Sequence, residues 1–251
     1  MNNQQIYLSI IIPAYNEELR LASSLEQIAA FLQQQTYTYE VLVVENGSAD
    51  RTLEIAQTFA QRFPFIRAIH EEGRGKGLAV RRGMLEASGS YRFMCDADLS
   101  MPIEEVRQFL PPVAPKAEII IGSREAEGAI RYDEPNSRHF GGRFVNLFIR
   151  LLALPGLRDT QCGFKMFSAA AAEDLFNIQK LDGWSFDIEV LFIARKRGYA
   201  IAEIGIPWYF ADFSHVSPVR DALRMVVDIL TMWLNHFSGI YRRKKDAPQI
   251  T

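Results

Sequence analysis

The stretch YRFMCDADLSMPIEE, residues 91–105, joins a run of apolar residues to two acids that end it. Tyr91 to Cys95 have the composition of a buried strand, and Asp96 and Asp98 follow with one residue between them. Residues i and i+2 of a strand point to the same side, so these two carboxylates can converge where the strand ends. Because a buried carboxylate is costly without a positive partner, this strand end is a candidate binding site.

The segments on both sides of this stretch alternate between strand-like runs and helical periodicity. The runs YLSIIIPAYN (7–16) and YEVLVVENGSAD (39–50) are predicted to be buried strands with polar exits, and residues 18–34 carry apolar side chains at helical spacing. This order is typical of an α/β fold, with a Rossmann-like, mostly parallel sheet covered by helices on both faces. We expect one domain over 1–251, with a nucleotide-binding core at about 6–124.

The second half of the chain has a different pattern. Residues 125–140 are polar and are predicted to form a long loop, which in a compact domain is usually functional. Helical periodicity then returns at about 141–153, 169–176, 186–197 and 218–238, with a late strand in YAIAEIGIPWYF. We expect about 125–251 to bind the second substrate.

Composition excludes several classes of protein. The 251 residues are 48% hydrophobic and 23% charged, with a formal net charge of −2, so no basic excess suggests nucleic-acid binding. Two cysteines in a chain of this length indicate a reducing, cytoplasmic compartment. The N-terminus lacks the pattern of a signal peptide, and no apolar run reaches the roughly 18–20 residues of a spanning helix.

Asp96 and Asp98 suit a hard divalent cation, Mg²⁺ or Mn²⁺, which also takes phosphate oxygens and water. The alternative is that these acids cap the next helix or pair with an arginine. The loop EEGRGKG, residues 71–77, could bring Lys76 to a diphosphate, although such a loop is equally consistent with a flexible basic turn.

Together, SIIIPAYNEE, VLVVENGSAD, GRGKGLAVRRGM and DADLSMP resemble the family 2 glycosyltransferases, whose nucleotide-sugar domain has the GT-A fold. The resemblance implies a nucleotide-sugar donor and a donor metal. It also implies site residues on the donor side: nucleobase and ribose contacts from Pro13, Ala14, Tyr15 and Glu17, a nucleotide contact from Lys76, and a metal motif of Asp96, Ala97 and Asp98. The family commonly has two aspartates where this chain has Glu45 and Asn46, so Glu45 is expected to contact the base.

The second half, through LRDTQCGFKMF and GWSFDIEVLFIA, resembles the polyprenyl-phosphate sugar transferases, above all the dolichyl-phosphate glucosyl type. The related mannosyl enzymes often have glutamine where this chain has Ser100, which favours the glucosyl branch. The resemblance implies inverting transfer of a hexose from UDP-glucose, with GDP-mannose second, to a polyprenyl phosphate. A soluble or glycan acceptor is one alternative, and a non-catalytic nucleotide-sugar-binding module is another.

A lipid phosphate is already a nucleophile at neutral pH, so the acceptor site needs positive charge more than a general base. The candidates cluster around the polar loop and beyond it: Arg124, Arg131, Arg138, Arg143 and Lys165. Arg124, at a strand end, is the strongest, and each of the others is as consistent with a solvated surface residue. Asp159 and Asp187 could orient these cations or act on the acceptor, and structural pairing is the favoured interpretation for Asp187.

Two amphipathic segments could place the protein on a membrane surface without spanning it. One is RFVNLFIRLLALPGL (143–157), and the other is the last helix, whose apolar stripe precedes the basic IYRRKK (240–245). Packing of either segment on the core is the alternative. We expect a peripheral protein on the cytoplasmic face of a membrane.

Overall fold

A computed structural model describes residues 5–132, 149, 152–210 and 218–243, with side chains of the last helix from residue 224 onward. Its centre is a seven-stranded sheet in the order β3-β2-β1-β4-β7-β5-β8, in which every strand except β7 runs parallel. The strands of this sheet are β1 (Leu8–Ala14), β2 (Tyr39–Glu45), β3 (Ile66–His70), β4 (Tyr91–Met94), β5 (Ile119–Ser123), β7 (Lys165–Ser168) and β8 (Ile201–Gly205).

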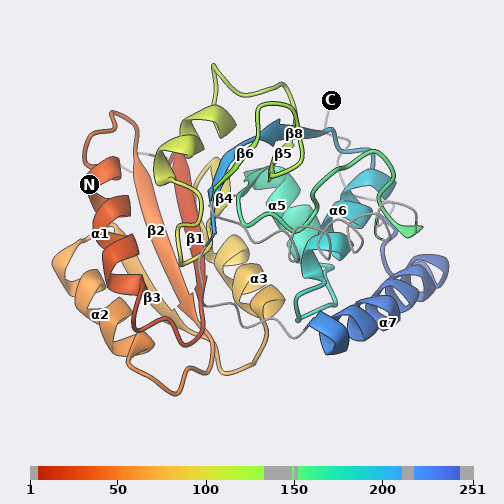
Figure 1. Ribbon diagram of the computed structural model, residues 1–251, viewed down its shortest axis with the longest axis horizontal. Helices are drawn as coiled ribbons and strands as arrows, with labels where there is room; N and C mark the ends of the chain where they lie inside the picture. The colour runs from red at the N-terminus through yellow and green to blue at the C-terminus, as the bar shows by residue number, and fades with distance from the viewer. Residues whose placement is uncertain (1–4, 133–148, 150–151, 211–217, 244–251) are drawn as a thin grey trace.

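Helices cover both faces of the sheet, as the alternating pattern predicts (Figure 1). Alternate residues of β1 divide between two cores: Ile10 and Ile12 face α1, α2 and η1, whereas Ile11 faces α3, α5, α6 and α7. The helices are α1 (Leu21–Leu32), α2 (Thr52–Arg62), α3 (Lys76–Glu86), the 3₁₀ helix η1 (Ile103–Phe109), α5 (Ala169–Phe176), α6 (Phe186–Lys196) and α7 (Pro218–Phe237).

The strand order reverses direction between β1 and β4. The chain passes from β1 through β2 to β3 on one side, and then returns to place β4 on the other side of β1. Loops that leave two such strands separate from one another, which opens a crevice at the carboxyl ends of the strands. The loops after Ala14 and Met94 therefore flank the ligand-binding position of an open α/β sheet.

Three features were not specified by the sequence-based expectations. The helix after Pro102 is a 3₁₀ helix. The segment GFKMF contains β7, which enters the sheet antiparallel between β4 and β5. Residues 130–132 of the expected loop form β6 (Ile130–Tyr132), which pairs with β9 (Pro207–Tyr209) in a separate parallel ribbon, so Pro207 lies outside the main sheet.

Candidate active site

The loop that leaves β1 is tied to the loop that leaves β2. The Asn16 N–H donates to Ser48 Oγ at 3.0 Å, and the Ala49 N–H donates to Asn16 Oδ1 at 2.9 Å. Asn16 has a φ of 53°, in the left-handed region that asparagine tolerates better than most residues. The segment PAYNEE therefore has a defined path beside the loop that carries Asp96 and Asp98, called the aspartate loop below.

Lys76 and Asp96 form the central contact of the site. Lys76 is the first residue of α3 and Asp96 follows β4, and Lys76 Nζ lies 2.6 Å from Asp96 Oδ1. Burial would raise the pKa of Asp96, but the Lys76 ammonium holds this pKa below its usual value. Burial would likewise lower the pKa of Lys76, and Asp96 reverses that effect, so both groups are charged.

Asp98 is less closely paired with a cation than Asp96 is. Its Oδ1 accepts a hydrogen bond of 3.0 Å from the Ser100 N–H, and its Oδ2 lies 3.8 Å from a guanidinium nitrogen of Arg20. Arg20 is in turn held by Glu17, whose two oxygens accept from Nε and Nη2 at 2.8 Å each. Arginine pairing, one of the alternatives to metal binding, thus occurs at Asp98. Capping of the next helix does not, because no side chain caps η1 at its N-terminus.

The residues expected to line the donor pocket lie in different environments. Pro13 and Ala14 are buried at the end of β1, Ala97 is buried and its carbonyl accepts from Ser24 Oγ at 2.6 Å, and Tyr15 is 39% exposed. Glu17 is partly buried by its pairing with Arg20. The exposed ring of Tyr15 is the part of this strand end that a base or ribose can reach.

Glu45 is buried, and both of its carboxylate oxygens have partners. The Ser48 N–H donates to Oε1, and His70 Nδ1 lies 2.7 Å from Oε2. Burial would raise the pKa of Glu45, but the Ser48 hydrogen bond and His70 bring this pKa below its ordinary value. The side chain that shares this pair and reaches solvent is His70, which is half exposed.

Lys165, predicted to bind an acceptor phosphate, is buried and already paired in the structure. The side chain is 1% exposed, and Nζ lies 2.8 Å from Asp187 Oδ1 and donates to the Cys162 carbonyl at 2.5 Å. Lys165 lies on β7 and Asp187 on α6, so the pair joins the sheet to the helix layer behind the Lys76–Asp96 contact. Structural pairing, the favoured alternative for Asp187, is what the structure shows.

Arg124 lies at the end of β5 and is fixed by a fully buried partner. Its Nε and Nη2 donate to the two oxygens of Asp159 at 2.6 and 2.8 Å, and its guanidinium lies 5.6 Å from the ring centre of Trp208. Arg131 lies against the same ring and donates to Glu125 at 2.7 Å. Arg138 and Arg143, the other two arginines expected to bind an acceptor phosphate, lie outside the described residues.

The residues present fit a divalent cation only in part. In the described part of the chain, no group of three or more His, Cys, Asp or Glu side chains is arranged to hold a metal ion. Asp98 and Asp96 would supply the oxygen ligands at the strand end, and Lys76 already contacts one oxygen of Asp96. Magnesium commonly binds through one or two carboxylates together with substrate phosphates, so this donor set fits an ion that arrives with a diphosphate.

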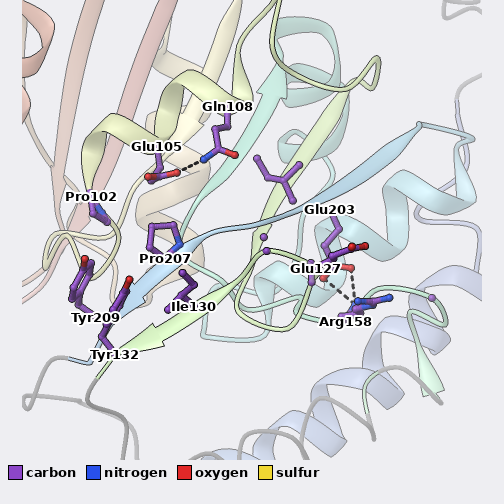
Figure 2. Close-up of a pocket in the computed structure, with 15 residues that line it drawn as sticks. Pro102, Glu105, Gln108, Glu127, Ile130, Tyr132, Arg158, Glu203, Pro207 and Tyr209 are labelled. Carbon is purple, nitrogen blue, oxygen red and sulfur yellow. Dashed lines mark hydrogen bonds between the residues drawn. The ribbon is translucent and has the colours of Figure 1, made fainter.

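A groove of about 990 Å³ begins beside the aspartate loop and follows the ribbon of β6 and β9 (Figure 2). The rings of Tyr132 and Tyr209 stack at one end, with centres 4.5 Å apart, and Glu203 and Arg158 lie at the other end. The Tyr209 N–H donates to the Ser100 carbonyl at 2.7 Å, which connects the groove to the site. Arg131 and Trp208 are paired at the middle positions of the two strands, between the residues that line the groove. Both lie on the side of the ribbon where Arg124 lies.

Two residues near the aspartates, Arg20 and Trp184, were not predicted from the sequence. Arg20 stands three positions after Glu17, a spacing that brings the two side chains together in a helical turn. Trp184 is 45% exposed, and Lys76 Nζ lies 5.1 Å from its ring centre. Nothing in the local sequence connects Trp184 with Lys76, because the segments meet only through packing of α3 against α6.

Comparisons with known proteins agree with this geometry. The family model described as Glycosyl transferase family 2 matches residues 9–176. A dolichyl-phosphate beta-glucosyltransferase of Homo sapiens is 34% identical over 253 residues, covering 94% of this chain and 77% of that protein. The enzyme of the same name from Dictyostelium discoideum is 32% identical over 256 residues, which cover 95% of this chain and 77% of that protein.

Solved structures share the fold at low sequence identity. Glucosyl-3-phosphoglycerate synthase of Mycobacterium tuberculosis in complex with UDP superposes with a TM-score of 0.65 and 18% identity, covering 90% of this chain and 80% of that one. For its complex with Mn²⁺, UDP and glucosyl-3-phosphoglycerate, the TM-score is 0.65 and the identity is 17%, and the match covers 92% of this chain and 79% of that one. The fold is therefore GT-A, and the protein is a glycosyltransferase. More narrowly, the chain belongs to glycosyltransferase family 2.

Gly163 provides a test of the position of Asp96. A Cβ atom at residue 163 would lie 2.0 Å from Asp96 Oδ2, so Gly163→Ala should push this carboxylate out of place. We expect kcat/KM for glycosyl transfer to fall about 100-fold, the cost of misplacing a reacting group by about 1 Å, while circular dichroism shows a retained fold. Gly183→Ala, whose Cβ meets no atom within 4 Å, is the matched control; equal activity of the two variants would contradict the prediction.

The Arg124–Asp159 pair predicts a pH-dependent stability. Burial would raise the pKa of Asp159, but Arg124 lowers it, so the pair stabilises the fold above the unfolded pKa of about 3.9 and loses this effect as pH falls through the folded pKa. Urea denaturation should show Asp159→Asn about 3 kcal/mol less stable than wild type at pH 7, with a smaller difference below about pH 4. Asp182→Asn, in an exposed pair, should cost less than about 1 kcal/mol. A deficit independent of pH would contradict the ionic explanation.

Proposed function

We propose that this glycosyltransferase transfers glucose from UDP-glucose to a polyprenyl phosphate of the dolichyl type. The proposal is supported by relatives named as dolichyl-phosphate beta-glucosyltransferases, which align with 94% and 95% of the chain and therefore include both halves. The donor side is supported by Lys76, Asp96 and Asp98 at the carboxyl ends of the parallel strands, where α/β sheets bind nucleotides.

The observation that carries the acceptor proposal is the position of Arg124. Its charge contributes to the lowered pKa of Asp96, so the two groups lie within electrostatic range although they follow different strands. Asp159 and the ring of Trp208 fix the guanidinium, and the Arg124 side chain is 23% exposed. A phosphate bound there would lie beside the donor, and a guanidinium that Asp159 holds in place presents a fixed positive charge to it.

The reaction that fits these residues is a single displacement. One oxygen of the acceptor phosphate forms a bond to the anomeric carbon while the bond from that carbon to the diphosphate breaks, and the configuration inverts. No protein general base is needed, because the phosphate is already anionic at neutral pH. Mg²⁺ or Mn²⁺, held by Asp98 and Asp96, would supply positive charge to the departing diphosphate. Lys76 contributes a fixed cation to the same end of the site.

A lipid acceptor requires access to a membrane, and α7 supports that requirement. No helix in the described ranges is long and apolar enough to span a bilayer. One side of α7 packs on the core through Met225, Ile229 and Met232. Its other side exposes apolar side chains, with Lys196, Arg242 and Arg243 nearby. The exposed residues of α7 are Val226, Val227, Leu230, Leu234 and Phe237, and Ile240, just beyond the helix, is exposed as well. An exposed apolar stripe next to basic residues is typical of interfacial helices.

The second amphipathic candidate, RFVNLFIRLLALPGL, lies largely outside the described residues. Of its described side chains, Ile149, Ala153, Leu154 and Leu157 are buried in the core, and Leu152 is 42% exposed. Core packing therefore accounts for most of the described part of this segment, and α7 is the favoured membrane contact.

Asp98→Ala tests the catalytic proposal against a pure binding module. We expect loss of metal-dependent transfer by at least about 100-fold, because a ligand to the leaving-group metal is removed. Glu104→Ala, at an exposed acid six positions along the chain, is the control and should keep wild-type activity. Transfer to dolichyl phosphate is measured with UDP-glucose and GDP-mannose, and with a soluble sugar as acceptor. Absence of turnover in the wild-type protein with every donor would favour the binding module.

Flotation with vesicles of phosphatidylcholine and phosphatidylserine tests the membrane contact. Wild type should bind, and the double variant Leu230→Glu/Leu234→Glu should bind at least about tenfold more weakly, since each buried leucine contributes about 1.5–3 kcal/mol. Val113→Glu, at an exposed apolar residue away from α7, should bind as wild type. Failure of the wild-type protein to bind would favour the soluble acceptor.

A further inference from the structure

Both carboxylates of the aspartate motif face a cation that belongs to the chain itself. Asp96 Oδ1 lies 2.6 Å from Lys76 Nζ, and Asp98 Oδ2 lies 3.8 Å from Arg20. The four side chains are all partly buried, with exposed fractions between 16% and 28%. At this degree of burial, charges interact more strongly than on an open surface, because less water screens them.

The two cations are held by different means. Lys76 begins α3 after the tight turn at Gly75, and it also lies over Trp184 and within the field of Asp187. Arg20 is held by the two hydrogen bonds to Glu17, which keep the guanidinium at an ion-pair distance of 3.8 Å from Asp98. The pair at Asp98 is therefore looser than the pair at Asp96.

We propose that Arg20 and Lys76 are built-in counter-ions of the metal site, which suppress metal binding until a nucleoside diphosphate arrives. A divalent cation alone would have to approach Asp98 and Asp96 against two resident positive charges. A diphosphate brings negative charge that Arg20 and Lys76 can contact, which frees the carboxylate oxygens for the metal. The diphosphate and the metal thus bind with positive coupling, and Arg20 is a positioning residue that the donor motif does not include.

This inference rests on the proposed function for the identity of the diphosphate. The resident cations are properties of the protein without ligand, so the first measurement needs no donor. A change of charge at Arg20 is preferable to one at Lys76, because Arg20 lies 3.8 Å from its aspartate, whereas Lys76 lies 2.6 Å from its own.

Titration of the ligand-free protein with Mn²⁺, followed by electron paramagnetic resonance, tests the inference. Arg20→Gln should bind Mn²⁺ about tenfold more tightly than wild type, because a repelling charge about 4 Å from the ligand is lost. Arg51→Gln is the matched control, since Arg51 is 74% exposed and pairs with Glu18. Its Mn²⁺ affinity should equal that of wild type. Lys76→Gln, checked for folding by circular dichroism, should also bind Mn²⁺ more tightly.

Calorimetric titration with UDP provides the second measurement. Wild type should bind Mn²⁺ much more tightly when UDP is saturating. In Arg20→Gln, the Mn²⁺ affinities with and without UDP should differ less, and UDP should bind more weakly in the absence of metal. Unchanged Mn²⁺ affinity in both Arg20→Gln and Lys76→Gln would overturn the counter-ion inference. If the variants bind Mn²⁺ more tightly but wild type binds no UDP, GDP or nucleotide sugar, the counter-ion role of Arg20 and Lys76 is supported and the proposed nucleotide-sugar donor is wrong.

Discussion

The ion pair between Lys76 and Asp96 is the contact on which the rest of the site depends. It joins the first turn of α3 to the end of β4, two segments that are adjacent in space because β4 returns to the far side of β1. The turn at Gly75 packs against the carbonyl of Asp182, and Gly163 leaves room for the Asp96 carboxylate. Both glycines therefore serve the same pair, since a side chain at either position would separate its members.

Charge balance explains how so many ionised groups are accommodated beneath the crevice. Lys165 is balanced by Asp187 and Arg124 by Asp159, and in each pair the acid is almost entirely buried. Burying a lone charge is prohibitive, whereas paired charges with satisfied hydrogen bonds are tolerated. The pair at Asp98 is the longest of these four pairs, at 3.8 Å, so it is the one that a ligand can exchange at the lowest cost.

Much of the fold was predictable from local pattern. Continuous apolar runs identify β1, β2 and β4, since strands buried on both faces need apolar residues throughout, and helical spacing identifies α1 and α7. The short β7 was not predictable, because its four residues lack strand periodicity and its place depends on β4 and β5. The convergence of Asp96, Asp98 and Lys76 followed from the rule for strand ends, whereas the burial of Lys165 was not predictable from its motif.

By itself, the sequence determined the class of fold, the positions of the two aspartates at a strand end, and the glycine loop that carries Lys76. These are consequences of residue periodicity and backbone freedom, which act over a few neighbouring residues. Only the tertiary structure decided which cation meets which acid: Lys76 with Asp96, Arg20 near Asp98, Lys165 with Asp187 and Arg124 with Asp159. Except for residues in one loop, such partners lie far apart in the chain, and packing of helices against the sheet selects among many possible pairs of opposite charge.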